Sequence, residues 1–211
     1  MIKQPVIFLA SLFFISSFTQ CNNSQPKPGN SVVPDSNTVQ NMYAPVDKSP
    51  MDMSYYPVDF PLQKMNGTAA EMPIARIIYS RPHKNGRVIF GTDDKSLCQY
   101  GLPWRLGANE ATEITIFKNV NISGTNVNKG TYVLYCVPHA DHWTLIFNRN
   151  LYTWGLHMDS TQDVLKTDVP VMAQQPVQEE FSVVFKDMPY GADLIMAWDN
   201  VKAAMPMEFS K

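Results

Sequence analysis

The chain has 211 residues, with 17 Lys and Arg against 19 Asp and Glu, so its formal net charge is −2 at pH 7. A weakly acidic surface of mixed charge gives no attraction for the phosphate backbone, which excludes nucleic acid as a partner. Aromatic residues make up 11% of the chain and charged residues 17%. This composition predicts a globular domain with an apolar core rather than a disordered chain.

The first twenty residues are typical of a secretory signal peptide. Lys3 supplies a positive charge and residues 6–15 form an apolar run, which is shorter than the ~20 residues that a transmembrane helix needs. Cys21 directly after this segment resembles the lipidated cysteine of a bacterial lipoprotein, although Gln20 stands where a small residue is usual. We therefore expect a protein of the bacterial cell envelope, anchored by lipid to a membrane facing the periplasm or the exterior. Ordinary cleaved secretion and an uncleaved anchor are the alternatives.

Residues 21–49 are rich in Asn, Ser and Pro and show no apolar periodicity, which predicts a disordered tether. Residues 50–211 are expected to form one β-rich domain. Its first segment, 51–62, alternates apolar residues among prolines, as an irregular or edge strand does.

Apolar residues then alternate with period two over most of the domain, which predicts antiparallel strands and hairpins. The strands are expected at 74–80, 112–117, 120–122, 131–137, 142–148, 181–185, 194–198 and 201–209. Short helices are expected at 159–165, with Asp159 or Ser160 as the cap, and at 95–100. Many short strands and few helices favour a β-sandwich or flattened barrel.

Two cysteines remain besides Cys21. Cys98 and Cys136 are candidates for a disulfide in an oxidising envelope, and two buried thiols are the alternative.

Several blocks of the sequence resemble a known family. They read YSRP from Tyr79, GRVIFG from Gly86, WRLGANEAT from Trp104, KGTYVLY from Lys129, and WTLIFN from Trp143. Together they are similar to the secreted bacterial envelope proteins called domain of unknown function 2911. The resemblance implies a mainly β domain exported to the envelope, and it assigns no activity and no catalytic residue.

The same blocks gather strong hydrogen-bonding groups among residues that restrict the backbone. Such groups are expected either in a binding cleft or in a buried structural network. The candidates for a ligand site are Arg81, Arg87, Trp104, Arg105, Asn109 and Glu110. In the structural alternative, Arg105 and Glu110 close a tight turn, Arg81 bonds carbonyls at a sheet corner, and the tryptophans pack in the core.

No motif of a known enzyme class occurs, whether nucleophile elbow, zinc-protease helix, P-loop or dinucleotide fingerprint. No cofactor is predicted. His139, Asp141 and His142 share one loop, but a zinc site needs three or four well-placed ligands, so no metal is predicted. The favoured function is non-catalytic binding of a saccharide or peptide. A hydrolase using Glu110 with Arg105 or Arg81, and a structural or assembly protein, are the alternatives, so an enzyme is not the leading expectation.

Overall fold

The computed structural model describes residues 43–209. The predicted signal peptide, Cys21 and most of the tether therefore lie outside the described residues. Within 43–209, none of the helices has the length and apolar content needed to cross a bilayer.

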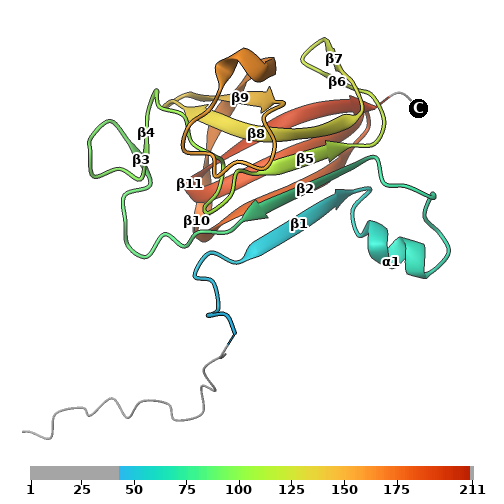
Figure 1. The fold of residues 1–211 in the computed structure, drawn as a ribbon, viewed down its shortest axis with the longest axis horizontal. Coiled ribbons are helices and arrows are strands. Elements are labelled where there is room, and N and C mark those ends of the chain that lie inside the picture. The colour runs from blue at the N-terminus through green and yellow to red at the C-terminus, as the bar shows by residue number, and fades with distance from the viewer. Residues whose placement is uncertain (1–42, 210–211) are drawn as a thin grey trace, which may run out of the picture. The chain divides into compact units, whose positions relative to one another are not determined.

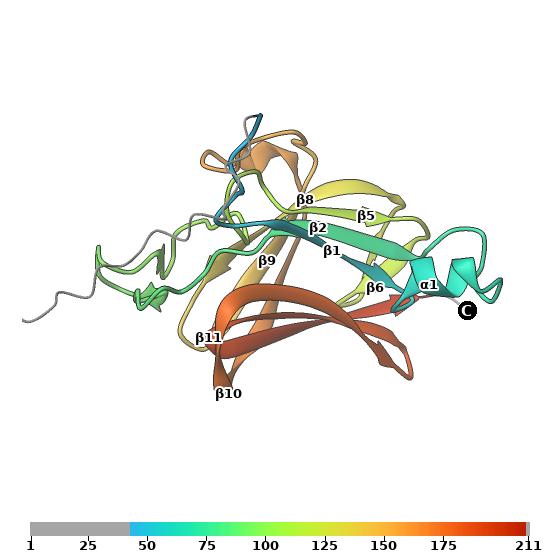
Figure 2. The ribbon, with the colours of Figure 1, turned by 90° about the horizontal axis from the view of Figure 1, so that it is seen from below.

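Nine strands form one antiparallel sheet that folds over itself into two layers (Figures 1 and 2). The upper layer in Figure 2 follows the spatial order β1 (Met51–Tyr56), β2 (Ala75–Ser80), β5 (Glu113–Ile116), β8 (Gly130–Pro138) and β9 (His142–Asn148). The order continues through β10 (Asp163–Met188) and β11 (Gly191–Phe209) to β6 (Val120–Ile122) and β7 (Thr125–Val127). This is the predicted mainly β fold, a sandwich that is not closed into a barrel.

The second layer exists because β10 and β11 are long and curved. The first part of β10, 163–170, pairs with β9, and the part from Val171 onward pairs with β11. The register between β10 and β11 shifts between Ala173 and Gln178 and again before Ser182. Such irregularities bend a strand, and here β10 passes from one layer to the other.

The core between the layers is built around an aromatic cluster. The ring of Trp104 lies 5.0 Å from Phe181, 5.7 Å from Trp143 and 5.8 Å from Trp198, measured between centroids. All four side chains are buried. Edge-to-face and offset contacts at these distances stabilise a core beyond the area that they bury.

The other face of the upper layer is covered in part by the β9–β10 loop (149–162), which includes a short 3-10 helix, η1 (Ser160–Gln162). Figure 2 shows this loop above β8, on the side away from β10 and β11. Leu151 and Met158 of the loop pack against a small buried cluster of Ala111, Val133, Tyr135 and Ile146. The sheet therefore has a large core on one face and a small one on the other.

Most predicted strands are confirmed within one or two residues, and those at 120–122 and 142–148 agree fully. The segments 181–185, 194–198 and 201–209 are parts of β10 and β11. The helix predicted at 159–165 is wrong beyond η1, because β10 begins at Asp163, although Asp159 caps η1 by accepting a hydrogen bond from the Thr161 amide. The helical turn predicted at 95–100 is wrong, since it contains β4 (Cys98–Gln99), paired with β3 (Phe90–Gly91).

The segment predicted as an edge strand at 51–62 is partly right. β1 pairs only with β2 and stands at the end of the sheet order, but it is followed by an unpredicted helix, α1 (Phe60–Met65). Pro61 lies at the start of this helix, where its missing N–H and fixed φ are tolerated.

Candidate functional site

The WRLGANEAT block forms a turn whose interior is a structural scaffold. Trp104 and Cys136 exchange both backbone hydrogen bonds, and the indole N–H of Trp104 donates to the carbonyl of Gly107 at 3.2 Å. The Thr112 hydroxyl donates to the carbonyl of Leu106 at 2.6 Å, and both of these residues are fully buried. A Cβ at Gly107 would lie 3.0 Å from the Ser80 carbonyl oxygen, so a larger residue would crowd the close approach of the turn to β2.

Arg105 projects from this turn and is half-buried. One of its terminal nitrogens donates to the carbonyl of Trp154 at 3.2 Å, and its guanidinium lies 5.8 Å from the centroid of the Trp154 ring. Burial lowers the pKa of Arg105, and the nearby charge of Glu110 opposes that shift. An arginine remains charged under these conditions.

Gly155 determines how closely the β9–β10 loop approaches Arg105. Its φ is +76°, and a Cβ there would lie 2.8 Å from the Cβ of Arg105 and 3.0 Å from that of Ala111. A left-handed φ and a contact this short both require glycine. The loop can therefore bring Trp154 over Arg105 only because residue 155 has no side chain.

Arg105 lines a surface cleft of about 510 Å³, which we call the arginine cleft. Arg87 lines it from the loop before β3, with its Nε donating to the Lys84 carbonyl at 3.0 Å and its Nη2 to the His83 carbonyl. Gln99 and the exposed Leu102 and Leu156 also line the cleft. The arginine cleft thus combines two cationic side chains with apolar surface.

Arg81 lies elsewhere and holds the two layers together. Its guanidinium pairs with Asp52 of β1 at 3.2 Å and donates to the carbonyl of Phe181 at 3.3 Å and the hydroxyl of Ser182 at 3.1 Å. Phe181 and Ser182 belong to β10. Arg81 therefore has the role expected in the structural alternative, in which it binds a carbonyl at a corner of the sheet.

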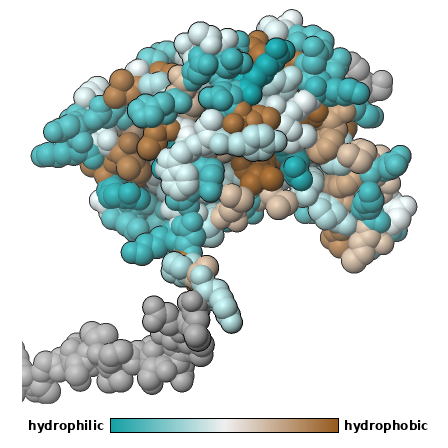
Figure 3. Space-filling view, in the orientation of Figure 1, coloured by the Kyte–Doolittle hydropathy of each residue, from teal (hydrophilic) through white to brown (hydrophobic). Residues whose placement is uncertain are grey.

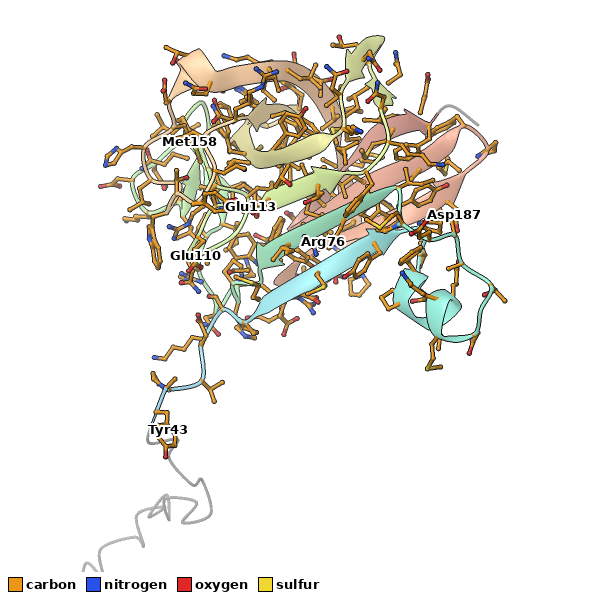
Figure 4. The ribbon with its side chains drawn as sticks, turned by 45° about the vertical axis from the view of Figure 1, so that its right-hand side comes forward. Tyr43, Arg76, Glu110, Glu113, Met158 and Asp187 are labelled. Atoms are coloured by element: carbon orange, nitrogen blue, oxygen red, sulfur yellow. The ribbon has the colours of Figure 1, made fainter. Side chains whose placement is uncertain are left out.

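The remaining two candidates, Asn109 and Glu110, do not line the arginine cleft. The Asn109 amide donates to Asp47 at 2.6 Å and so fastens the segment before β1 to the turn. Glu110 lines a second cleft of about 420 Å³ on the outer face of the sheet, which we call the glutamate cleft. Glu113 of β5 lines the same cleft, and Figure 4 shows both glutamates at the end of the sheet where β2 ends and β5 begins.

The expectation that one cleft is built from Arg81, Trp104, Arg105, Asn109 and Glu110 is therefore wrong. Arg87, Trp104 and Arg105 line the arginine cleft and Glu110 lines the glutamate cleft. Trp104 is only 8% exposed, because its ring fills the core and leaves little area for a ligand. The exposed tryptophan is Trp154, at 54%.

Neither Glu113 nor Trp154 is among the residues that the sequence indicates as candidates for a ligand site. Glu113 stands in an alternating strand, where a single glutamate indicates only an outward position. For Trp154 a signal was present, since it precedes Gly155 in a stretch without periodicity.

The histidines and cysteines complete the set of reactive side chains. The rings of His139 and His142 stack at 4.4 Å, and Asp141 contacts Nδ1 of His142 at 2.8 Å. Within residues 43–209 no three His, Cys, Asp or Glu side chains are arranged to hold a metal. Cys98 and Cys136 are both buried and free, and burial raises the pKa of both thiols. The disulfide between them stays a prediction.

Comparison with known proteins identifies the family. The sequence model described as "Protein of unknown function (DUF2911)" matches residues 61–207, so the chain belongs to this family. No curated protein and no solved structure matches the chain.

Proposed function

We propose that this family member binds an anionic ligand non-catalytically in the arginine cleft, through Arg105 and Arg87. The observation that carries the proposal is the unused hydrogen-bonding capacity of Arg105. A guanidinium has five N–H donors, and only one hydrogen bond joins that of Arg105 to any of the described residues.

A half-buried cation with free donors favours a carboxylate or phosphate. Arginine binds such groups through two parallel N–H bonds, which adds geometric specificity. Partial burial of Arg105 excludes some of the water that would otherwise compete for these donors and screen the charge. Arg87 adds a second positive charge in the same cleft.

The apolar rim indicates that the ligand is more than a free anion. Trp154 is 54% exposed and lies against Arg105 beside the cleft, and the exposed Leu102 and Leu156 line the cleft itself. An exposed indole provides a flat surface for a sugar ring or an aromatic side chain. An acidic saccharide or a peptide carboxylate is the ligand class that fits both features.

Trp154 fluorescence provides the test, because the other three tryptophans are buried. Oligogalacturonate and an acidic peptide are titrated separately. One of them is expected to bind, and the one that binds should protect Trp154 from acrylamide quenching. Arg105→Gln should weaken that binding by about tenfold or more, since a charge-assisted hydrogen bond contributes about 1.5–3 kcal/mol. The matched control is Arg149→Gln, at an exposed arginine that lines neither cleft. Equal affinity in the Arg105 variant contradicts the proposal.

The hydrolase alternative requires a second acid beside Glu110 within a cleft, and Glu113 meets that requirement. The arginines that this alternative combined with Glu110 do not line the same cleft, since Arg105 lines the arginine cleft and Arg81 is bound to Asp52. We therefore favour binding. Turnover of aryl glycosides that disappears in Glu110→Gln would reverse this preference.

The assembly alternative requires an exposed apolar patch around Tyr55, Tyr56 and Phe60. Phe60 is buried, and the ring of Tyr56 stacks on Phe209 at 5.1 Å. The exposed apolar side chains of this region are instead Leu62, Met65 and Met72, and Figure 3 shows apolar surface around α1 at the lower right. Nothing among the described residues indicates which partner would cover this patch, so we propose no assembly role for it.

We propose that the protein is located in the bacterial cell envelope and anchored there by lipid on Cys21, as the first twenty-one residues predict. Metabolic labelling with a palmitate analogue is expected to mark the protein, and Cys21→Ser should abolish the label. Labelling that survives this substitution contradicts the anchor.

A further inference from the structure

The glutamate cleft has its own chemistry, distinct from that of the arginine cleft. Met51 and Ile78 supply apolar surface from β1 and β2, and Tyr152 and Thr153 line it from the β9–β10 loop. Met51 is the direct neighbour of Ser80, and Ile78 that of Glu113, in the registers of the sheet. The cleft thus combines an apolar floor with two carboxylates.

Neither carboxylate is held in an ion pair among the described residues, although Glu110 feels the charge of Arg105 from outside the cleft. No ion pair within 4 Å joins Glu110 or Glu113 to another residue in the described part of the chain. The one hydrogen bond to these carboxylates is a long one, from the Tyr152 amide to Glu113 at 3.4 Å. Arg76 stands two residues before Ile78 on the same face of β2 and could compete for Glu113, but it too forms no ion pair with any described residue.

Ser80 provides an independent sign of a ligand. Residues alternate across a strand, so Ser80 faces the outer side with Ile78, whereas Tyr79 faces the core. Ser80 is only 2% exposed and lines the glutamate cleft. Its hydroxyl has no hydrogen-bond partner among residues 43–209. The oxygen is not one of the fully enclosed polar atoms without a partner, so its open side faces the cleft that Ser80 lines.

We propose that the glutamate cleft binds a primary alkylammonium group carried on a short apolar chain, as in a lysine side chain. An ammonium has three donors and no acceptor, which matches the carboxylates of Glu110 and Glu113 and the acceptor lone pairs of Ser80. The methylene chain packs on Met51 and Ile78, as long cationic side chains do on apolar surface. This site is separate from the arginine cleft and does not depend on the function proposed above.

The test compares two probes that differ by the terminal ammonium group. Nα-acetyl-lysine N-methylamide carries the ammonium, and Nα-acetyl-norleucine N-methylamide has an uncharged side chain of similar length. Binding to the protein is followed by the NMR shifts of the Ser80, Ala111 and Tyr152 amides. The lysine probe should bind about tenfold more tightly than the norleucine probe, since hydrogen bonds to charged groups are the stronger ones.

Substitutions then assign the effect to named groups. Glu113→Gln and Glu110→Gln keep the shape and remove the charge, so each should reduce the preference for the lysine probe several-fold, and the double variant should abolish it. Ser80→Ala should weaken the lysine probe alone. Glu71→Gln, at an exposed glutamate outside the cleft, should change nothing. Equal binding of the two probes, or an unchanged preference in the double variant with an intact NMR spectrum, overturns the proposal.

Discussion

The two faces of the upper layer show how one sequence block serves two purposes. Between the layers, Trp104 and Leu106 lie in a dense aromatic and aliphatic core. On the outer side, the β9–β10 loop covers only a small cluster and leaves Arg105 and Glu110 partly open to solvent. The difference teaches that the buried residues of WRLGANEAT fix the turn, whereas its two charged residues are held at the surface by that turn.

The largest expected effect is the loss of Trp104. Trp104→Ala empties the centre of the aromatic cluster and should lower the free energy of unfolding by about 3–5 kcal/mol. Trp154→Ala removes a side chain that is 54% exposed and should cost less than about 1 kcal/mol. Urea denaturation measures the free energy of unfolding of both variants. Similar decreases in the two would contradict the assignment of Trp104 to the core and Trp154 to the surface.

The second effect concerns the contact between the β9–β10 loop and the turn. Gly155→Ala combines a left-handed φ with a Cβ 2.8 Å from that of Arg105, whereas Gly101→Ala has φ +81° and no atom within 4 Å of the added Cβ. The backbone term alone is about 1–2 kcal/mol, and overpacking adds about 1–3 kcal/mol at Gly155. Urea unfolding should therefore show a larger loss for Gly155→Ala, and equal losses would contradict the close packing of this loop.

The third effect separates the two arginines. Arg81→Met removes two hydrogen bonds to β10 and the partly exposed ion pair with Asp52, and should destabilise the protein by about 1–3 kcal/mol, since each bond contributes about 1 kcal/mol and the exposed pair less. Arg105→Met removes one hydrogen bond and a stacking contact, and should cost about 1 kcal/mol. For binding of the anionic probe we expect the opposite order, with a large loss of affinity in Arg105→Met and little change in Arg81→Met. Loss of binding in folded Arg81→Met and not in Arg105→Met would reverse the two roles.

The fold was predictable as far as its patterns are local. Alternation located β8 and β9 within a residue or two, because each has one face toward each core. The length of β10 was not predictable, since its stretch around 172–180 is exposed and polar and lacks alternation. It is a strand because β11 pairs with it, which is a long-range interaction.

The site was predictable in composition but not in arrangement. Arg81 and Arg105 lie in the same motif region of the sequence. In the structure, however, Arg81 is hydrogen-bonded to two residues of β10 and one of β1, whereas Arg105 donates to the carbonyl of Trp154. These partners lie from 29 to 101 positions away in the chain. Local spacing carries no information on such contacts, so the structural and ligand roles could not be separated.

The smallest expected effect tests the cluster under the β9–β10 loop through pH. Burial raises the pKa of Tyr135, and its hydrogen bonds to Asp163, at 3.0 and 3.1 Å, raise it further. A tyrosine that holds its proton more tightly when folded contributes its full stability below the unfolded pKa of about 10 and loses it as pH rises further. The sign follows because the unfolded chain binds fewer protons above that pH.

Tyr135→Phe should therefore lower the free energy of unfolding by about 1 kcal/mol near neutral pH, through the lost hydrogen bond. The difference in the free energy of unfolding between parent and variant should become smaller as pH rises above about 10, because only the parent has a phenol at residue 135 that can ionise. Urea denaturation at a series of alkaline pH values measures it. Tyr152→Phe, at a side chain that is 92% exposed, is the control and should leave the pH dependence unchanged. A constant gap for Tyr135→Phe would mean that the phenol ionises as easily under the loop as in water, and that the outer cluster is open rather than packed.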